Sequence, residues 1–348
     1  MFSRRSSGGP DNSFISILGI VGSGKTVYLS MLYHSCTNPD LFHDPIHKLV
    51  KPVAKPLKGK DILIEYQKKI EEGRFPPKTL PGRYVGEEMG TNENEIIRNI
   101  RKFQISMEIR PTVEEYSRIV PAIQLTTYDL PGEYLVKLYD DPNAKSEAVI
   151  DAMVNDCFKR SNKFIFTIDP RPESEGLQQR VLFFILDDIF KIKKEQYGEE
   201  KLKKESPVKI AFALTKMDMF PNQFNAPYEF CESLIWQPLQ YAVLYFGKNS
   251  VRTFSTSATG GHDIKIVRDG VTGKERRVIT PPANLKPKGL LQPIFWLMDI
   301  NLPVDEMEDI TGSLSDDTIS NNPPPNKEKK EFDRRKGFID FDEDIEEL

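Results

Sequence analysis

Residues 19–26 read GIVGSGKT, and the types and spacing of these residues are suited to holding phosphate groups. The pattern of Gly, four residues, Gly-Lys and a hydroxyl residue is that of a P-loop. Backbone N–H groups of a P-loop face phosphate oxygens, so Lys25 would reach the β- and γ-phosphates and Thr26 would give a hydroxyl ligand to Mg2+. The nucleotide-binding residues predicted in this segment are Gly22, Ser23, Gly24, Lys25, Thr26 and Val27.

Residues 129–133 read DLPGE and directly follow a run that is typical of a strand. A carboxylate at the end of a strand holds Mg2+ through water, and a glycine N–H three residues later contacts a γ-phosphate. Asp-x-x-Gly is also an ordinary turn sequence, so its place after the P-loop gives the pattern its weight. Asp129 is therefore predicted to be a metal ligand, and Gly132 is predicted to be catalytic together with Lys25.

Residues 215–218 read TKMD and end another apolar run. Guanine differs from adenine in its N1–H and 2-amino donors, so the carboxylate of Asp218 would select guanine by accepting from both. Lys216 would lay its aliphatic stem along the ring face. The alternative is a solvated turn, in which case the P-loop would belong to an ATPase or a nucleotide kinase. The predicted base-binding residues are Thr215, Lys216, Asp218, Ser257 and Ala258, the last two from the segment STSATG.

These segments need a scaffold of alternating strands and helices. Strands are expected at residues 14–18, 104–109, 123–128, 164–168, 208–214 and 251–255. Helices are expected at residues 25–34, 62–70, 176–194, 228–245 and 288–298, and a β-hairpin at 261–280. The alternation predicts a three-layer α/β P-loop NTPase fold, with a mostly parallel sheet and one antiparallel edge strand.

The chain is expected to form one large domain with flexible ends. Residues 1–12 are predicted to be a leader and residues 13–300 a single nucleotide-binding domain, with insertions at 36–102 and 261–280. Residues 301–348 hold 6 basic and 15 acidic residues, a net charge of -9, which predicts a disordered acidic tail.

Composition narrows the class of protein. The net charge of -4, with basic and acidic residues mixed along the chain, gives no reason to expect nucleic acid as a partner. Three widely spaced cysteines argue against a disulfide framework and for a reducing compartment. No run approaches the length of a membrane span, so a cytoplasmic protein is expected.

The segments GIVGSGKT, DLPGE, TKMD and SAT, in this order, resemble the G1, G3, G4 and G5 elements of the Ras-like small-GTPase superfamily of TRAFAC P-loop GTPases. The resemblance extends over residues 13–299. The long insertion, which falls in the switch I region, is similar to that of a group of predicted bacterial GTPases called double-GTPase or conflict-system GTPases. The resemblance implies Mg2+-dependent binding of GTP, hydrolysis to GDP and phosphate, and a conformational switch as the output.

Two departures from this family bear on the reaction. The switch threonine that coordinates Mg2+ is assigned first to Thr79 and second to Thr91. Glu133 stands where Ras-like enzymes usually have a water-orienting glutamine, so the resemblance implies that Glu133 is catalytic and would orient or deprotonate water. Its carboxylate would sit near the negative γ-phosphate, so intrinsic hydrolysis would be slow, and a GTP-binding module without hydrolysis is an alternative. No arginine finger is assigned, although four arginines lie in or near the insertion: Arg74, Arg83, Arg98 and Arg101.

The resemblance also implies partners. GTP and GDP are the expected ligands. A protein effector or regulator would contact the insertion at 36–102 or the acidic tail, and a second GTPase chain is a candidate for that partner.

Overall fold

The computed structural model describes residues 14–20, 22–38, 52–76, 104–111, 123–128, 136, 157–268 and 275–300. The chain divides into two units, Met1–Gly312 and Ser313–Leu348, and all of the described residues belong to the first. The predicted leader, the predicted acidic tail and much of the predicted insertion at 36–102 lie outside the described residues.

Four parallel strands form the sheet that carries the site. They are β1 (Ile15–Leu18), β5 (Lys163–Ile168), β6 (Lys209–Leu214) and β7 (Val251–Ser255), in the order β1-β5-β6-β7. Ile17 pairs with Ile165, which in turn pairs with Ala211. Nearly every residue of these strands is buried, which explains why they read as continuous apolar runs.

Three antiparallel strands form a second sheet in the order β2-β3-β4. They are β2 (Pro52–Lys58), β3 (Gln104–Pro111) and β4 (Ile123–Tyr128). The hydroxyl of Thr127 accepts a hydrogen bond from the Ile17 N–H (3.2 Å) and donates one to the Ile17 carbonyl (3.1 Å), so β4 lies against β1. The predicted mostly parallel sheet with an antiparallel edge is confirmed, and β2 adds a strand that was not expected.

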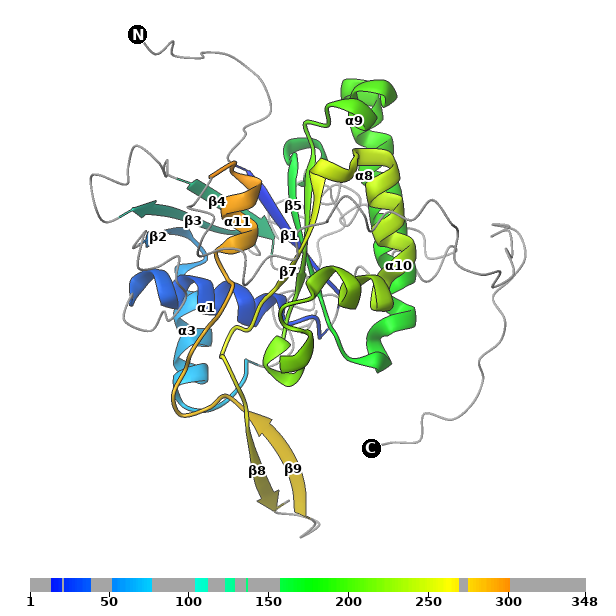
Figure 1. The fold of residues 1–348 in the computed structure, drawn as a ribbon. Coiled ribbons are helices and arrows are strands. Elements are labelled where there is room, and N and C mark those ends of the chain that lie inside the picture. The colour runs from blue at the N-terminus through cyan, green and yellow to red at the C-terminus, as the bar shows by residue number, and fades with distance from the viewer. Residues whose placement is uncertain are drawn as a thin grey trace, which may run out of the picture. The chain divides into compact units, whose positions relative to one another are not determined.

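Helices cover the parallel sheet on both faces (Figure 1). Phe164 and Phe166 of β5 point into a core shared with α8 (Glu175–Tyr197) and α10 (Pro227–Phe246). Ile165 points into a second core, shared with three other helices. These helices are α1 (Lys25–Thr37), α3 (Lys60–Glu71) and α11 (Gln292–Leu297). The predicted three-layer α/β architecture is therefore confirmed.

Shorter elements connect these layers. The helix α9 (Glu199–Lys204) follows α8. In the part of the chain that the structure describes, the loops also hold four 3-10 helices: η4 (Pro172–Ser174), η5 (Met217–Met219), η6 (Pro221–Gln223) and η7 (Lys248–Ser250). The predicted hairpin is formed by β8 (Asp263–Arg268) and β9 (Glu275–Thr280). Among the helices that the structure describes, none is long and apolar enough to cross a membrane.

The last helix is shorter than the 288–298 expected from the sequence, because the backbone of Lys288 is used elsewhere. Its N–H donates to the Ser257 carbonyl (2.8 Å), and its carbonyl accepts from the Ser257 N–H (3.0 Å). A residue whose backbone groups form a β-bridge cannot also begin a helix, so α11 starts only at Gln292.

Candidate functional site

The predicted P-loop lies between a strand and a helix, as its chemistry requires. β1 ends at Leu18, and α1 begins at Lys25 after Gly24, which has a left-handed backbone (φ 78). The Ser23 N–H donates to the Ile20 carbonyl (3.2 Å), which closes a turn within the loop. Lys25, in the first turn of α1, is buried. This strand-loop-helix unit directs the first backbone N–H groups of α1 toward the end of the sheet.

The P-loop is fixed to the neighbouring strand β5. The hydroxyls of Ser23 and Thr167 are hydrogen-bonded (2.8 Å), and Thr167 also donates to the Leu18 carbonyl (3.1 Å). A Cβ at Gly19 would lie 2.0 Å from the Thr167 hydroxyl oxygen, a distance no side chain tolerates. Glycine is therefore required at position 19 for the loop to pack this closely on β5.

The TKMD segment reaches the P-loop through two hydrogen bonds. The Thr215 hydroxyl donates to the Ser23 carbonyl (2.7 Å), across 192 residues of sequence. The Lys216 ammonium donates to the Gly22 carbonyl (2.6 Å), across 194 residues. Lys216 adopts a positive φ of 54, a conformation that costs free energy for a residue with a side chain. These contacts join the predicted phosphate-binding and base-binding loops into one structure.

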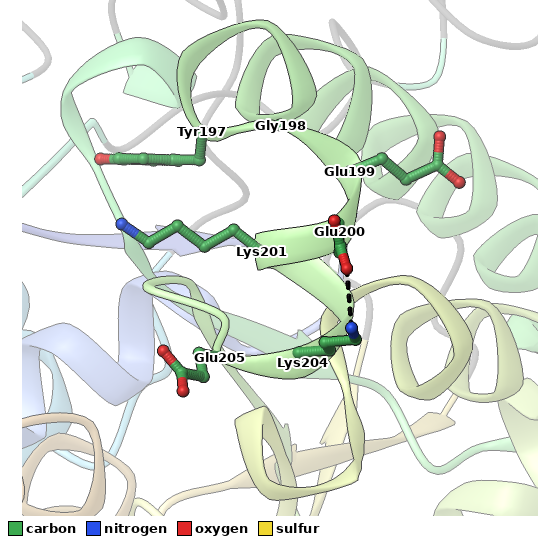
Figure 2. A pocket seen from close by; sticks show the side chains of 7 residues that line it. All are labelled: Tyr197, Gly198, Glu199, Glu200, Lys201, Lys204 and Glu205. Carbon is green, nitrogen blue, oxygen red and sulfur yellow. Dashed lines mark hydrogen bonds and ion pairs between the residues drawn. The ribbon is translucent and has the colours of Figure 1, made fainter.

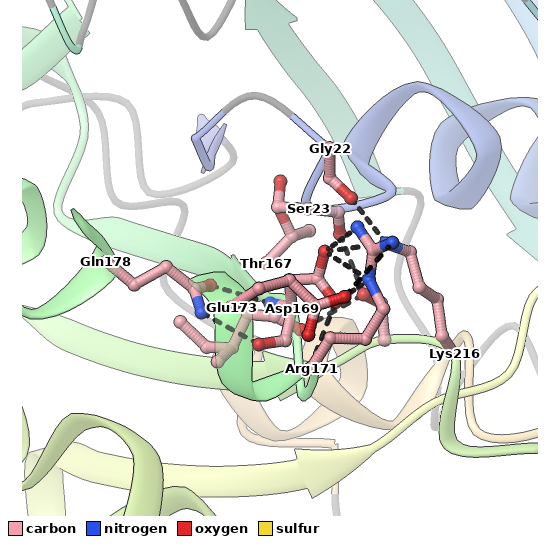
Figure 3. A network of polar contacts seen from close by, with 10 residues as sticks. Gly22, Ser23, Thr167, Asp169, Arg171, Glu173, Gln178 and Lys216 are labelled. Atoms are coloured by element: carbon pink, nitrogen blue, oxygen red, sulfur yellow. Dashed lines mark hydrogen bonds and ion pairs between the residues drawn. The ribbon is translucent and has the colours of Figure 1, made fainter. Parts of the chain in front are cut away.

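A buried aspartate stands behind this junction (Figure 3). The carboxylate of Asp169 is fully buried and lies 2.7 Å from the Lys216 ammonium. Arg171 donates to both of its oxygens, with Nη2 to Oδ2 at 2.6 Å and Nε to Oδ1 at 3.0 Å. Burial alone would raise the pKa of Asp169, but the hydrogen bonds and charges of Arg171 and Lys216 outweigh it and lower the pKa. Asp169 is therefore held as an anion.

The backbone of Asp169 is fixed by a glutamine. The side-chain amide of Gln178, in α8, donates to the Asp169 carbonyl (2.7 Å) and accepts from the Asp169 N–H (2.7 Å). This two-point contact replaces the sheet hydrogen bonds that end with β5 at Ile168. The carboxylate thus has one position between the P-loop and the TKMD segment.

Sequence reasoning missed Asp169 and Arg171. The available signal was DPR directly after a buried strand that neighbours β1, because polar groups at carboxyl ends of adjacent parallel strands meet. Arg171 lies at the P-loop, with Nη2 3.6 Å from where a Cβ of Gly22 would be. Of the four arginines in or near the predicted insertion, none of which was assigned a role, Arg74 pairs with the exposed Glu72 after α3. The others, Arg83, Arg98 and Arg101, lie outside the described residues.

The predicted base-binding residues also come together. The Ser257 hydroxyl donates to Asp218 Oδ1 (2.6 Å), and His262 Nδ1 lies 3.3 Å from Asp218 Oδ2. The Met217 N–H donates to the Thr256 carbonyl (3.2 Å), which ties the loop after β6 to the loop after β7. Ala258, next to Ser257, is partly buried. The structure therefore unites TKMD with both the P-loop and the SAT segment.

The remaining predicted residues divide into two groups. Thr26 is partly buried in the first turn of α1, and its carbonyl accepts from the Ser30 hydroxyl (2.7 Å). Val27 packs against the core on the α1 face of the sheet. Four predicted residues and the second choice for the switch threonine lie outside the described residues: Thr79, Thr91, Asp129, Gly132 and Glu133.

A surface cavity of about 480 Å3 lies where α8 meets α9 (Figure 2). Its lining residues are Tyr197, Gly198, Glu199, Glu200, Lys201, Lys204 and Glu205. Its charged groups pair locally, as Lys204 does with Glu200 (2.7 Å). It includes none of the predicted site residues, so the candidate site is the junction of the three loops.

The structure has weak similarity to solved structures. It matches the S. cerevisiae Ski7 GTPase-like domain bound to GDP and inorganic phosphate at 14% identity and a TM-score of 0.34, covering 70% of this chain and 43% of that chain. It matches Methanosarcina barkeri Roco2 RocCORdC bound to GDP at 12% identity and a TM-score of 0.27, covering 74% of this chain and 46% of that chain. It matches a septin GTPase domain from Chlamydomonas reinhardtii at 12% identity and a TM-score of 0.25, covering 84% of this chain and 91% of that chain.

The chain spans less than half the length of the Ski7 and Roco2 chains. At such low identities and TM-scores, these similarities assign no function to this protein. No known family model matches the sequence, and no curated protein matches it. A functional proposal therefore depends on the residues of the site.

Proposed function

We propose that this protein binds guanine nucleotides and hydrolyses GTP as a conformational switch. The observation that carries the proposal is the junction in which Lys216 and Thr215 bond to the carbonyls of Gly22 and Ser23. Three sequence motifs, each with its own predicted contact to a nucleotide, thereby meet at the carboxyl ends of β1, β6 and β7. Ligands of open parallel sheets bind at this edge.

On the phosphate side, the chain offers backbone N–H groups and the ammonium group of Lys25. Gly22 and Gly24 both have positive φ, so their N–H groups can turn toward a common centre. Lys25, in the first turn of α1, would balance the charge of the β- and γ-phosphates. Mg2+ suits the hydroxyl oxygen of Thr26, because this ion prefers oxygen ligands and phosphate oxygens, and it would neutralise charge on the phosphates.

On the base side, Asp218 would accept the N1–H and 2-amino hydrogens of guanine. Ser257 holds one of its carboxylate oxygens by a hydrogen bond of 2.6 Å. Adenine has neither donor at these positions, so the carboxylate would discriminate against it. The Lys216 stem would line the ring, while its ammonium stays on Gly22 and Asp169.

Hydrolysis and switching rest on sequence. Asp129 and Thr79 would complete the Mg2+ site, and Gly132 would sense the γ-phosphate. Glu133 would orient the attacking water, although a carboxylate beside a phosphate predicts slow turnover. The insertion at 36–102 would order with GTP and loosen with GDP, and a protein effector or regulator would bind it. Membership of the double-GTPase group, with a second GTPase chain as partner, belongs to the same proposal.

Titration of the purified protein with GTP, GDP and ATP in the presence of Mg2+ tests the proposal. Asp218→Ala should abolish the preference for guanine, and Lys25→Ala should weaken the binding of every nucleotide. Asp188→Ala, which removes a carboxylate on α8, is the matched control and should bind as the wild type does. Equal binding of ATP and GTP that Asp218→Ala leaves unchanged would assign the protein to other P-loop NTPases.

Phosphate release under single-turnover conditions then tests hydrolysis. Slow release that Glu133→Ala abolishes would support an enzyme with Glu133 in the proposed role. Tight GTP binding without release over hours would favour a GTP-binding module without hydrolysis.

A further inference from the structure

The carboxylate of Asp218 contacts a second side chain, that of His262, which was not predicted from any sequence motif. His262 Nδ1 lies 3.3 Å from Asp218 Oδ2, while the Ser257 hydroxyl occupies Oδ1 at 2.6 Å. The side chain of Asp218 is 10% exposed and that of His262 is 28% exposed, so the contact is partly shielded from water. Each oxygen of the carboxylate is therefore held by a different side chain.

The loop that carries His262 is built to bring it to this place. The Gly260 N–H donates to the Ser257 hydroxyl oxygen (2.9 Å), and the Thr259 hydroxyl donates to the Gly261 carbonyl (2.7 Å). The Lys286 N–H donates to the Thr259 carbonyl (2.9 Å), which anchors the loop to the segment before α11. These bonds fix the turn between β7 and β8, so His262 meets Asp218 through an ordered path.

The number of acceptor positions on the carboxylate matches this arrangement. An ionised carboxylate offers about four lone-pair positions. Two would accept from guanine, and Ser257 and His262 fill the other two. For His262 to donate, its Nδ1 must carry a proton, which holds in the Nδ1–H tautomer and in the charged ring. Donation from both sides would hold the carboxylate in one orientation when the base arrives.

We propose that His262 is a positioning residue that sets the selectivity of this site for guanine. The inference rests on the proposed function and deepens it. His262 acts through Asp218, because its ring nitrogen faces the carboxylate. Without it, Oδ2 would be free to turn toward water, and the two-point contact with guanine would lose part of its alignment.

Competition against a fluorescent GDP analogue, with GDP, ADP and pyrophosphate as competitors, tests the proposal. His262→Ala should lower the affinity for GDP about 10-fold, which is the effect of losing one hydrogen bond to a charged group. ADP and pyrophosphate should compete as they do with the wild type, so the preference for guanine falls by the same factor. His262→Asn keeps an N–H donor near the place of Nδ1 and should recover most of the loss.

Controls separate this role from a general loss of structure. Lys265→Ala changes an exposed residue of β8 near His262 and should bind all competitors as the wild type does. Ser257→Ala removes the other donor and should lower guanine preference as His262→Ala does. Equal weakening of GDP and pyrophosphate by His262→Ala, or an unchanged GDP affinity, would overturn the proposal. A wild type that binds no guanine nucleotide would instead refute the proposed function.

The wild-type protein gives a second measurement, which stands even where a variant fails to fold. Long-range 15N spectra of the imidazole rings report which nitrogen carries the proton. The proposal requires a proton on Nδ1 of His262. A neutral His262 ring protonated only at Nε2 would present a lone pair to the carboxylate and would overturn the proposal.

Discussion

Two clusters of opposite charges in this protein look alike in composition but differ in the burial of the carboxylate and in how far along the chain its lysine partners lie. One joins Asp169, Arg171 and Lys216 behind the P-loop (Figure 3). The other joins Glu199 with Lys194 and Lys203 around α9. Glu199 also lines the surface cavity (Figure 2). In the first cluster the carboxylate is fully buried and its lysine is 47 residues away, whereas in the second every side chain is exposed and the partners are close in sequence.

This difference shows which charges bear on function. Glu199 has its pKa lowered to about 2 by its hydrogen bonds to Lys194 and Lys203. Water and salt screen such exposed pairs, so the shift carries little stability. Asp169 also has a lowered pKa, but it had to overcome burial to reach it. Burial combined with partners from distant segments therefore distinguishes the site, while the number of charges and the presence of a cavity do not.

Lys193 is a buried cation that has no carboxylate partner in the hydrogen bonds described below. Its substitution is expected to change the unfolding free energy more than any other substitution considered. Its side chain is fully buried in α8, and its ammonium donates to the Lys159 carbonyl (3.1 Å) and to Gln196 (2.8 Å). Burial lowers its pKa from 10.5 to about 8, with a smaller opposing effect of Cys157. The unfolded chain then binds more protons between pH 8 and 10.5, so the stability of the folded state rises with pH in this window.

Lys193→Met should remove that rise. Urea unfolding below pH 8 and near pH 10.5 should show that the difference in unfolding free energy between wild type and variant changes by up to about 3 kcal/mol. Lys194→Met changes the neighbouring residue, which is half exposed, and should leave the pH dependence of the wild type intact. Parallel pH profiles of wild type and Lys193→Met would contradict the expectation.

Asp169→Ala should give the next largest effect, because it leaves two cations close together at the P-loop. Breaking a buried ion pair costs about 3 to 5 kcal/mol. Lys216 and Arg171 keep some contact with water, so a loss of about 2 kcal/mol in unfolding free energy is expected. Since the pKa of Asp169 lies below its unfolded value of 3.8, its contribution is present above that pH and is lost as the pH falls through the folded pKa.

Chemical denaturation at neutral pH and in acid measures both parts of this expectation. Wild type and Asp169→Ala should converge in stability as the pH falls below about 3.8. Asp188→Ala removes an exposed carboxylate and is expected to change stability little at either pH. If Asp169→Ala and Asp188→Ala were equally mild, the contrast between buried and exposed clusters would fail.

Arg171→Ala should lower the unfolding free energy by less than Asp169→Ala does, because Asp169 keeps Lys216 as a partner. The guanidinium is 36% exposed, so screening reduces the loss to about 1 kcal/mol. A double-mutant cycle with Asp169→Asn measures the coupling between the two side chains directly. Coupling near zero would mean that their two-point contact adds nothing to stability.

The sequence revealed those parts of the site that depend on local patterns. GIVGSGKT predicted its own strand-loop-helix context, because the glycines and Lys25 act within a few residues of one another. TKMD and SAT were found in the same way. The hydrogen bonds that unite them were not predictable from any one segment, because Thr215 and Lys216 reach the P-loop only after β1, β5 and β6 pair.

The features that were missed depend on distant contacts. β2 reads PVAKPLK, with two prolines and two lysines, and such residues lower the expectation of a strand even though sheet edges tolerate them. The role of His262 could not be predicted from the sequence, because it depends on the fold placing the loop after β7 beside Asp218. Likewise, the expected start of the last helix was wrong because Lys288 bonds to Ser257 rather than to its own helix. Tertiary structure decided each of these outcomes.

Glu199→Gln should give the smallest effect, and it sharpens the contrast from the exposed side. The substitution removes the charge that pairs with Lys194 and Lys203 but keeps the size of the side chain. Thermal unfolding at low and high salt should show a shift of no more than about 1 °C, because salt already screens these pairs and neighbouring lysines remain solvated. A shift as large as that of Asp169→Ala would mean that exposed pairs around α9 stabilise the fold as strongly as the buried cluster. The two clusters would then differ only in location, because the cluster around Asp169 lies at the P-loop and the cluster around Glu199 does not.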